Sequence, residues 1–249
     1  MARELRRLLL SPERLSAATD RLQVPLLADE LHYLQRVLRL RDGDPFAVVD
    51  GVGHLWQARL AATQALLEQP LEQPACCMPP PLVRLELAVA LPRRDGDVIL
   101  RMASELGIDA IQPLLAERSV VERWNVKRAS AIVREAIEQC ERLWLPALPD
   151  PRPLASVLPQ ADGIRLWATT RDDALPALAQ ELARLRAPAG ELPSRVVVAI
   201  GPEGGWTAAE EAAARAQGWV PVQLGGPILR SSTAAVAAAV QLCSWRDAL

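Results

Sequence analysis

Two short segments rich in glycine and proline stand out as places where a ligand could bind. They are Ile200-Gly201-Pro202-Glu203-Gly204-Gly205-Trp206-Thr207 and Leu224-Gly225-Gly226-Pro227-Ile228-Leu229-Arg230. Glycine lets a backbone come close to a ligand and present its N–H and C=O groups. One such segment is most simply a tight turn. Two of them, expected at neighbouring strand ends, favour a ligand site, because open α/β sheets bind ligands outside the carboxyl ends of their strands.

Other familiar catalytic machinery is missing from the sequence. It has no GxxxxGK[ST] phosphate loop and no G-x-S-x-G elbow. The only histidines, His32 and His54, lie far from both segments in the chain, which disfavours a Ser–His or Cys–His pair there. No His, Asp or Glu cluster has metal-ligand spacing, and the four cysteines form no C-x-x-C pair, so we expect no metal. Backbone, apolar side chains and an arginine suit a cofactor that brings its own reactivity.

An alternation of strands and helices is expected to position the two segments. Strands are predicted at 83–91, 108–115, 164–168, 195–200 and 220–224, and helices up to 105 and at 127–142, 173–186, 207–217 and 231–246. This alternation predicts a parallel α/β sheet with helices on both faces. The proline-rich stretch 146–159 is expected to be a long surface loop within that domain.

The N-terminal part has a different pattern. Prolines crowd the stretch QPLEQPACCMPPP, which predicts a boundary between a domain at 1–75 and a domain at 82–249. Strands are predicted at 45–50 and 54–60. Gly51 and Gly53 fit the turn between them better than a nucleotide fingerprint, because the third glycine is missing and a strand follows.

A predicted helix at 29–40 carries a cluster of basic residues. Leu31, Leu34 and Leu38 fall on one side at helical spacing. The other side carries the basic residues of this segment, followed directly by a further arginine: His32, Arg36, Arg39 and Arg41. These side chains form either a solvated helix face or a small patch for phosphates. Spacing alone leaves both interpretations open.

Composition narrows the protein class. The chain has 249 residues, a formal net charge of −2, and 50% hydrophobic residues, as in soluble globular proteins. The sequence starts with basic residues, but the apolar run that follows them is too short for a signal peptide. The longest uncharged run is shorter than a membrane span. We therefore expect a cytoplasmic protein without a membrane segment. At this net charge, any nucleic-acid binding must come from a local patch.

The two Gly/Pro segments, taken together, resemble a known family. IGPEGGWTAAE followed by LGGPILRSSTAA is similar to the paired C-terminal motifs of the RsmE-type ribosomal RNA methyltransferases of the SPOUT class. HYLQRVLRLRDGD and DGVGHLWQARL resemble the family's N-terminal PUA-like barrel. SELGIDAIQPLLAERSVV and EAIEQCERLWLPAL resemble its middle motifs. It is the occurrence of all these motifs in order that makes the resemblance specific.

The resemblance implies a fold and an activity. The C-terminal domain would be a SPOUT trefoil-knotted parallel sheet, and the N-terminal domain a PUA-like RNA-binding β-barrel. The enzyme would be a homodimer that uses S-adenosyl-L-methionine to methylate N3 of a uridine in 16S ribosomal RNA, presented as RNA or as the assembled small ribosomal subunit. Strand counting alone could not have predicted a knot, because knots are rare exceptions to the rules of chain connection.

The resemblance also assigns residues. The implied cofactor-binding residues are Ile200, Gly201, Pro202, Glu203, Gly204, Gly205, Leu224, Gly225, Ile228 and Leu229. The implied RNA-binding residues are His32, Arg36, Arg39, Arg41 and Arg142. Glu135, Gln139 and Arg142 match the family's E-A-x-E-Q-x-x-R motif. Arg230 is the candidate catalytic cation, because a fixed positive charge near a uracil oxygen would stabilise the negative charge that develops there.

Departures from the family pattern keep alternatives open. Ser232 stands where the family usually has a glutamate, Met102 where a lysine is usual, and the segment between Val121 and Glu135 is shorter. One alternative is another SPOUT enzyme acting on a ribose 2′-OH or on guanine N1. The other, motivated by Ser232, is a non-catalytic RNA-binding factor for ribosome assembly.

Overall fold

The β-branched run at Arg195–Ile200 forms strand β11 in the interior of a six-stranded sheet. The computed structural model describes residues 5–18, 20, 22–92, 94–120, 124–159, 162–170, 174–185 and 191–249. The strand order is β12-β10-β11-β7-β8-β9, and all five pairings are parallel. The other strands are β7 (Arg84–Val89), β8 (Ala110–Leu115), β9 (Arg152–Pro153), β10 (Ile164–Ala168) and β12 (Val220–Val222). The predicted parallel α/β sheet is confirmed.

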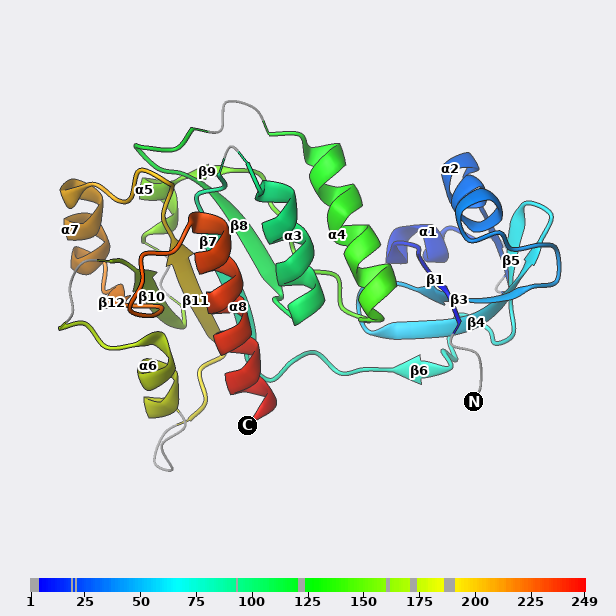
Figure 1. Ribbon diagram of the computed structural model, residues 1–249. Helices are drawn as coiled ribbons and strands as arrows, with labels where there is room; N and C mark the ends of the chain where they lie inside the picture. The colour runs from blue at the N-terminus through cyan, green and yellow to red at the C-terminus, as the bar shows by residue number, and fades with distance from the viewer. Residues whose placement is uncertain are drawn as a thin grey trace. The chain divides into compact units, whose positions relative to one another are not determined.

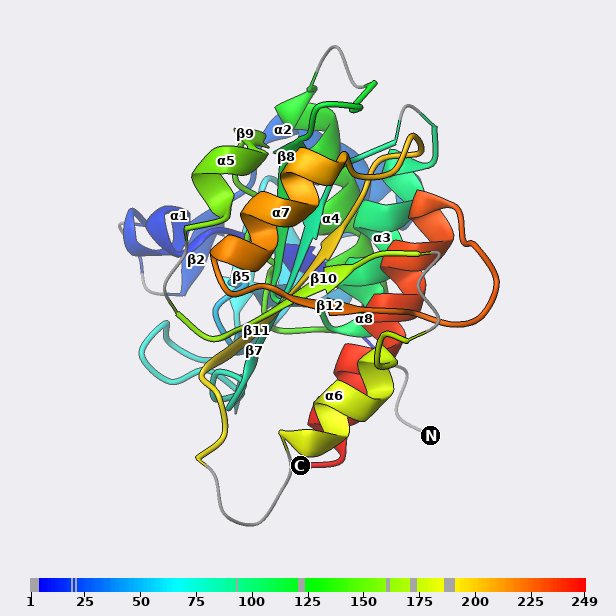
Figure 2. The same cartoon turned by 90° about the vertical axis from the view of Figure 1, so that its left-hand side faces the viewer.

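Alternate residues of the central strand enter two separate cores. Val196 and Val198 pack with helices α3 (Gly96–Leu106), α6 (Leu178–Arg184) and α8 (Ser231–Asp247). Val197 and Ala199 face the opposite core, which includes residues of α5 (Leu154–Val157) and α7 (Ala208–Ala216). Figures 1 and 2 show these two groups of helices on opposite faces of the sheet. Burial on both faces explains why the strand is apolar throughout.

Capping residues set the ends of several helices. Thr207 caps α7 by accepting a hydrogen bond from the backbone N–H of Glu210, whose side chain binds back to the cap, as the predicted capping box requires. Gly107 ends α3 with a φ of 115°, a conformation that favours glycine. Helix α4 covers Val126–Cys140, two residues short of its predicted end. Residues 173 and 186, the predicted ends of the helix that contains α6, lie outside the described residues.

The stretch 146–159 corrects the expectation of a surface loop. It contains β9, which pairs with β8 at the edge of the sheet, and the single turn of α5. Leu154, Val157 and Leu158 are buried in the same core as Val197. Prolines obscured this packing in the sequence, because a two-residue edge strand needs few donors and leaves no periodic pattern.

The N-terminal strands form a second sheet of six strands. Its order is β1-β3-β4-β5-β2, with β6 paired to β4. The strands are β1 (Arg7–Leu9), β2 (Gln23–Pro25), β3 (Pro45–Val49), β4 (His54–Ala61), β5 (Gln64–Leu67) and β6 (Cys76–Cys77). The predicted hairpin of β3 and β4 is confirmed: the strands are antiparallel, and Gly51 and Gly53 in the turn have φ of 77° and 105°. Phe46, Leu34 and Leu60 are fully buried in the core beside this sheet, together with residues of helix α1 (Pro12–Ser16).

The predicted helix at 29–40 is shorter and less regular than expected. Helix α2 (Ala28–His32) continues into a π-helical turn, η1 (Tyr33–Val37). Arg39 lies beyond the helix with a φ of 60°. The apolar side was predicted correctly. Leu34 is part of the core beside the N-terminal sheet, and Leu31 and Leu38 pack against that core. A π-turn inserts extra backbone into the helical repeat, so equal spacing in the sequence no longer means an equal direction after Tyr33.

The chain divides into two units. The first comprises Met1–Pro80 and Arg134–Leu145, and the second comprises Pro81–Val133 and Pro146–Leu249. The division between Pro80 and Pro81 falls in the proline-rich stretch. The return of Arg134–Leu145 to the first unit was not expected, because helix α4 runs through the second division and its periodicity does not change there.

Candidate functional site

Both Gly/Pro segments line a single pocket in the second unit. The pocket has a volume of about 320 Å³, and its lining includes all ten residues that the family resemblance assigns to the cofactor. The two strands that precede the segments, β11 and β12, were expected to be direct neighbours, but they are not. Strand β10 lies between them, and Ala168, Thr169 and Thr170 at its carboxyl end also line the pocket. Three parallel strands therefore end at this site, in agreement with the rule for α/β sheets.

Glycines shape the pocket for different reasons. A Cβ atom on Gly201 would lie 2.9 Å from the indole ring of Trp206, so this position leaves no room for a side chain. Gly205 has a φ of 71°, a conformation that other residues rarely adopt. A Cβ on Gly225 or Gly226 would meet no described protein atom within 4 Å, so both backbones border open space. Long side chains would fill the volume that these residues leave free.

Aromatic stacking supports the base of the first segment. Trp206 stacks on Trp167 with ring centroids 4.0 Å apart and an interplanar angle of 29°. Its indole N–H donates to the carbonyl of Ala168 at 2.9 Å, which ties the segment to the end of β10. Trp219 meets Trp167 edge-on from the same core. The tryptophan contacts could not be predicted from the sequence, because Trp167 is far in the chain from the other two.

Polar side chains hold the two segments from outside. Ser231, the first residue of α8, donates its hydroxyl to the carbonyl of Gly201 at 2.9 Å, which links the second segment to the first. Thr169 donates to Glu211 of α7 at 2.8 Å. Arg118, in the turn after β8, donates to the carbonyl of Gly204 at 2.9 Å. These residues were not predicted from the sequence, although Ser231 stands inside a motif that was quoted.

Arg230 occupies a different position from its neighbours. It is the N-cap residue of α8, is exposed, and makes no side-chain capping bond. Leu229 and Ser231 on either side line the pocket, but Arg230 is not among the lining residues. Ile228 lines it with 66% of its surface exposed. The predicted cation is thus adjacent to the pocket in the chain, and its role as a contact to substrate remains a prediction.

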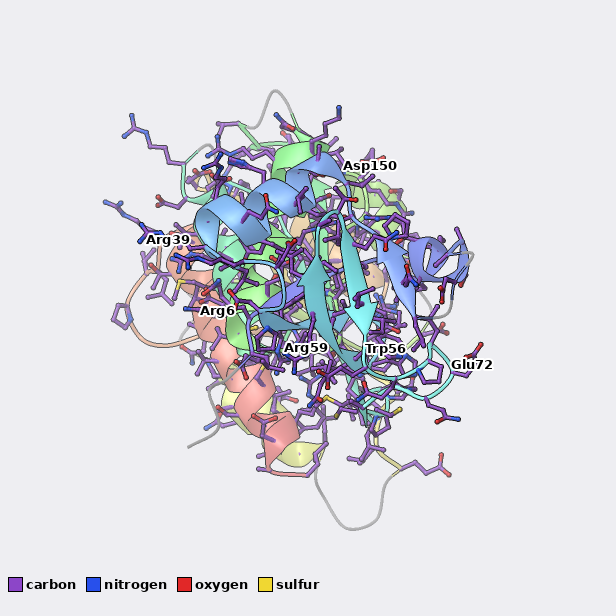
Figure 3. The ribbon with its side chains drawn as sticks, turned by 90° about the vertical axis from the view of Figure 1, so that its right-hand side faces the viewer. Arg6, Arg39, Trp56, Arg59, Glu72 and Asp150 are labelled. Carbon is purple, nitrogen blue, oxygen red and sulfur yellow. The ribbon has the colours of Figure 1, made fainter. Side chains whose placement is uncertain are left out.

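The predicted RNA-facing residues lie in the first unit. His32, Arg36, Arg39 and Arg41 are all exposed, and Arg142 is half-buried with interactions of its own. Figure 3 labels Arg39 and Arg6 on the same flank of this unit. Because of the π-turn, the basic residues are distributed over a helix, a turn and the following loop and do not form a single helix face.

A buried polar cluster joins two motifs of the first unit. Glu138 of α4 is only 7% exposed and accepts a hydrogen bond from the backbone N–H of Leu9 at 2.8 Å. Burial raises the pKa of the Glu138 carboxyl to about 7, and the nearby charge of Glu135 acts in the same direction. Burial, then the charge of Glu138, also raises the pKa of Tyr33, while a hydrogen bond with Gln139 lowers it. Tyr33 thus connects the segments HYLQRVLRLRDGD and EAIEQCERLWLPAL, which lie far apart in the chain.

The described residues form neither a metal-binding cluster nor a membrane-spanning helix. No group of three or more His, Cys, Asp or Glu side chains there could hold a metal ion. None of the described helices combines the length and the apolar character that crossing a membrane requires.

Family models match both units. Residues 78–242 match an RNA methyltransferase domain, and residues 26–66 match an RNA methyltransferase PUA domain. The first match covers the pocket, and the second covers α2, η1 and the β3–β4 hairpin. The six-stranded N-terminal sheet therefore belongs to a PUA-like domain.

Individual relatives agree with these models. The chain is 40% identical to the ribosomal RNA small subunit methyltransferase E of Synechocystis sp. over 246 residues, which are 95% of this chain and 76% of the relative. It is 28% identical to the protein of that name from Rickettsia conorii, with 91% and 92% coverage. A crystal structure of the Neisseria gonorrhoeae enzyme of that name, bound to S-adenosyl methionine, matches with a TM-score of 0.77 and 27% identity over 97% of this chain and 98% of that one. The chain belongs to the family of ribosomal RNA small subunit methyltransferase E.

Proposed function

We propose that this protein transfers a methyl group from S-adenosyl-L-methionine to N3 of a uridine in small-subunit ribosomal RNA. The observation that carries the proposal is the pocket built by two Gly/Pro segments at the ends of three parallel strands, in a chain of this methyltransferase family. The names of the relatives support small-subunit ribosomal RNA as the substrate. The specific base rests on the resemblance of the sequence motifs.

The pocket residues fit this cofactor. A volume of about 320 Å³ is at the lower end of the range for small-molecule sites, about 300–1,000 Å³. Apolar side chains of Ile200, Leu224 and Leu229 can pack on an adenine ring, and the backbone of the glycines can bind its edge and the ribose. The bound S-adenosyl-L-methionine in the Neisseria gonorrhoeae structure supports this choice. When bound, this cofactor supplies a methyl group already activated on a sulfonium centre.

The chain must then position the base and favour loss of its N3 proton. Holding both reactants in attack geometry can lower a barrier by roughly 7–11 kcal/mol. We assign to Arg230 the stabilisation of the negative charge that spreads to the uracil oxygens. Arg230 is exposed and lies in the chain between Leu229 and Ser231 of the pocket wall, which supports this role. Once held by the two Gly/Pro segments, the cofactor would supply its methyl group to N3 and would leave as the neutral thioether S-adenosylhomocysteine, while the N3 proton would pass to water.

RNA binding is proposed for the first unit. The exposed His32, Arg36, Arg39 and Arg41, with Arg142, would bind phosphates of the RNA, and the match to a PUA domain supports this.

We further propose that the six-stranded sheet closes as a barrel, with functional domains at 1–75 and 82–249. The remaining resemblance adds a trefoil knot around the cofactor segments, a homodimer and a cytoplasmic location. Val240, 43% exposed on α8 beside Ala237, supports a face for a second copy.

Methyl transfer to purified small ribosomal subunits tests the function. We expect radiolabel from S-adenosyl-L-methionine to enter the small-subunit RNA, and nucleoside mass spectrometry to identify N3-methyluridine. Label in a ribose 2′-OH or a guanine would overturn the proposed acceptor. Binding of S-adenosylhomocysteine without any transfer would favour the non-catalytic RNA-binding factor instead. Absence of that binding would refute every methyltransferase assignment.

A further inference from the structure

A tight turn after β8 is attached to the cofactor pocket at two points. The turn closes on itself, since Ser119 donates its backbone N–H to the carbonyl of Ala116 at 3.0 Å and accepts from the N–H of Ala116 at 2.9 Å. The backbone N–H of Glu117 donates to the carboxylate of Glu210 at 2.8 Å. Because Glu210 also belongs to the capping box of α7, this bond fixes the turn relative to the end of the first Gly/Pro segment.

The second attachment is the side chain of Arg118. Its Nη1 donates to the carbonyl of Gly204 at 2.9 Å and is 3.4 Å from the carbonyl of Trp206. A Cβ atom on Gly204 would lie 3.1 Å from Cβ and 3.2 Å from Cδ of Arg118, so the arginine stem lies directly over this glycine. Gly204 is not among the glycines with positive φ. A side chain at Gly204 would force Arg118 to shift by a few tenths of an ångström, whereas glycine at Gly205 suits a positive φ.

We infer that Arg118 is a positioning residue of the cofactor pocket, which holds the 203–206 backbone in its binding-competent shape. The inference rests on the proposed function for the identity of the ligand. Arg118 itself lines the pocket and is exposed, so its loss removes little buried surface. Both contacts come from Nη1, which the rigid guanidinium plane holds in place, whereas the ammonium group of a lysine is a compact charge on a flexible stem. Its contribution should therefore appear in ligand affinity more than in stability.

Calorimetric titration of the full chain with S-adenosylhomocysteine tests this inference through two single variants and their combination. Arg118→Ala should weaken binding about tenfold, the expected effect of losing charge-assisted hydrogen bonds that order the segment. Gly204→Ala should also weaken it, by at most the same factor, because the new methyl forces the arginine stem to shift by a few tenths of an ångström. The double variant should be no weaker than Arg118→Ala, since the atoms closest to that methyl belong to Arg118. Additive losses of about a hundredfold would overturn the inference.

Two further variants separate positioning from general damage. Gly96→Ala is the matched control, because Gly96 lies at the start of α3 with no atom within 4 Å of its Cβ position and should leave affinity unchanged. Arg118→Lys should recover part of the affinity by reaching one carbonyl. In steady-state assays Arg118→Ala should raise the KM for the cofactor and leave kcat at saturation nearly unchanged. A lowered kcat and a lowered melting temperature without a change in KM would indicate a merely structural role.

Amide hydrogen exchange without ligand keeps this inference separate from the proposed function. The N–H of Gly205 donates to the carbonyl of Pro202 at 2.9 Å, inside the segment that Arg118 holds. Arg118→Ala should accelerate exchange at Gly205 at least several-fold and leave the core of β11 unchanged. If the wild-type chain fails to bind S-adenosylhomocysteine while this acceleration is present, the proposed function is wrong and the positioning role of Arg118 stands. Unchanged exchange at Gly205 would overturn that positioning role itself.

Discussion

The pocket of the second unit is built largely from backbone and short side chains, whereas the basic segment of the first unit is dominated by long, exposed ones. Gly201, Gly205 and their neighbours are held by a stacked tryptophan and by hydrogen bonds from Ser231 and Arg118. Arg36 and Arg39, by contrast, extend from a π-turn and a loop into solvent. The first region is defined by shape, and the second by charge.

This difference predicts how each region tolerates substitution. In the pocket, one added methyl group at Gly201 would have to displace an indole ring that is itself packed on Trp167. On the basic segment, a single side chain can move or be replaced with little effect on its neighbours, and its contribution is screened by salt. Substitutions in the pocket should thus act on the cofactor, and substitutions on the basic segment on RNA.

Arg230→Ala should have the largest effect, and it tests whether the pocket acts by shape alone. We expect turnover to fall about 10²–10³-fold, the usual result of losing a donor that stabilises developing charge, while affinity for S-adenosylhomocysteine stays near normal. Because Arg230 makes no side-chain capping bond to α8, the melting temperature should hardly change. Transfer rates and calorimetry measure the two quantities. Normal turnover per folded molecule would remove Arg230 from the mechanism and leave the reaction without an assigned catalytic cation.

Charge reversal on the first unit sharpens the other side of the comparison. Arg36→Glu combined with Arg39→Glu should weaken RNA binding about tenfold at physiological salt and reduce the salt dependence of binding, because fewer counterions are released. Cofactor affinity should not change. The control, Arg184→Glu with Arg215→Glu, makes the same net charge change on exposed arginines of α6 and α7. An unaltered salt slope in the first variant would mean that the segment is only a solvated surface.

Glu138→Gln should have the smallest effect on methyl transfer, and it probes the buried exception within the first unit. Folding raises the pKa of Glu138 from 4.5 to about 7, so the folded state favours the protonated carboxyl. This contribution to stability is fully present below pH 4.5 and is lost as the pH rises through about 7. Over that window the wild type should lose on the order of 3 kcal/mol of unfolding free energy relative to the variant. Urea unfolding at a series of pH values measures this.

The glutamine variant keeps an acceptor for the N–H of Leu9. Glu138→Leu removes that acceptor and should lower the unfolding free energy at every pH. Parallel curves for wild type and Glu138→Gln would show that the carboxyl does not titrate in this range.

Local patterns in the sequence were sufficient for much of the fold. The apolar run of β11, the capping box at Thr207 and the glycine turn between β3 and β4 all concern residues close together in the chain, and all three were predicted correctly. The Gly/Pro composition likewise pointed to the two segments that supply most of the pocket lining. Each of these features depends on backbone conformations that a few consecutive residues impose.

Features that depend on distant segments could not be predicted in this way. The insertion of β10 between β11 and β12, the contact of Arg118 with Gly204 and the return of Arg134–Leu145 to the first unit all join residues far apart in the sequence. The burial of Leu154 and Val157 in a proline-rich stretch belongs to the same class. Periodicity shows that a residue faces a core, but the partner it meets there is set by the pairing of whole strands and the packing of whole helices. The amino-acid sequence by itself determined most elements of the second unit, the pocket-lining segments and the family. Only the tertiary structure decided strand order, the packing of 146–159 and the side chains that brace the pocket, because those contacts form after distant elements have packed together.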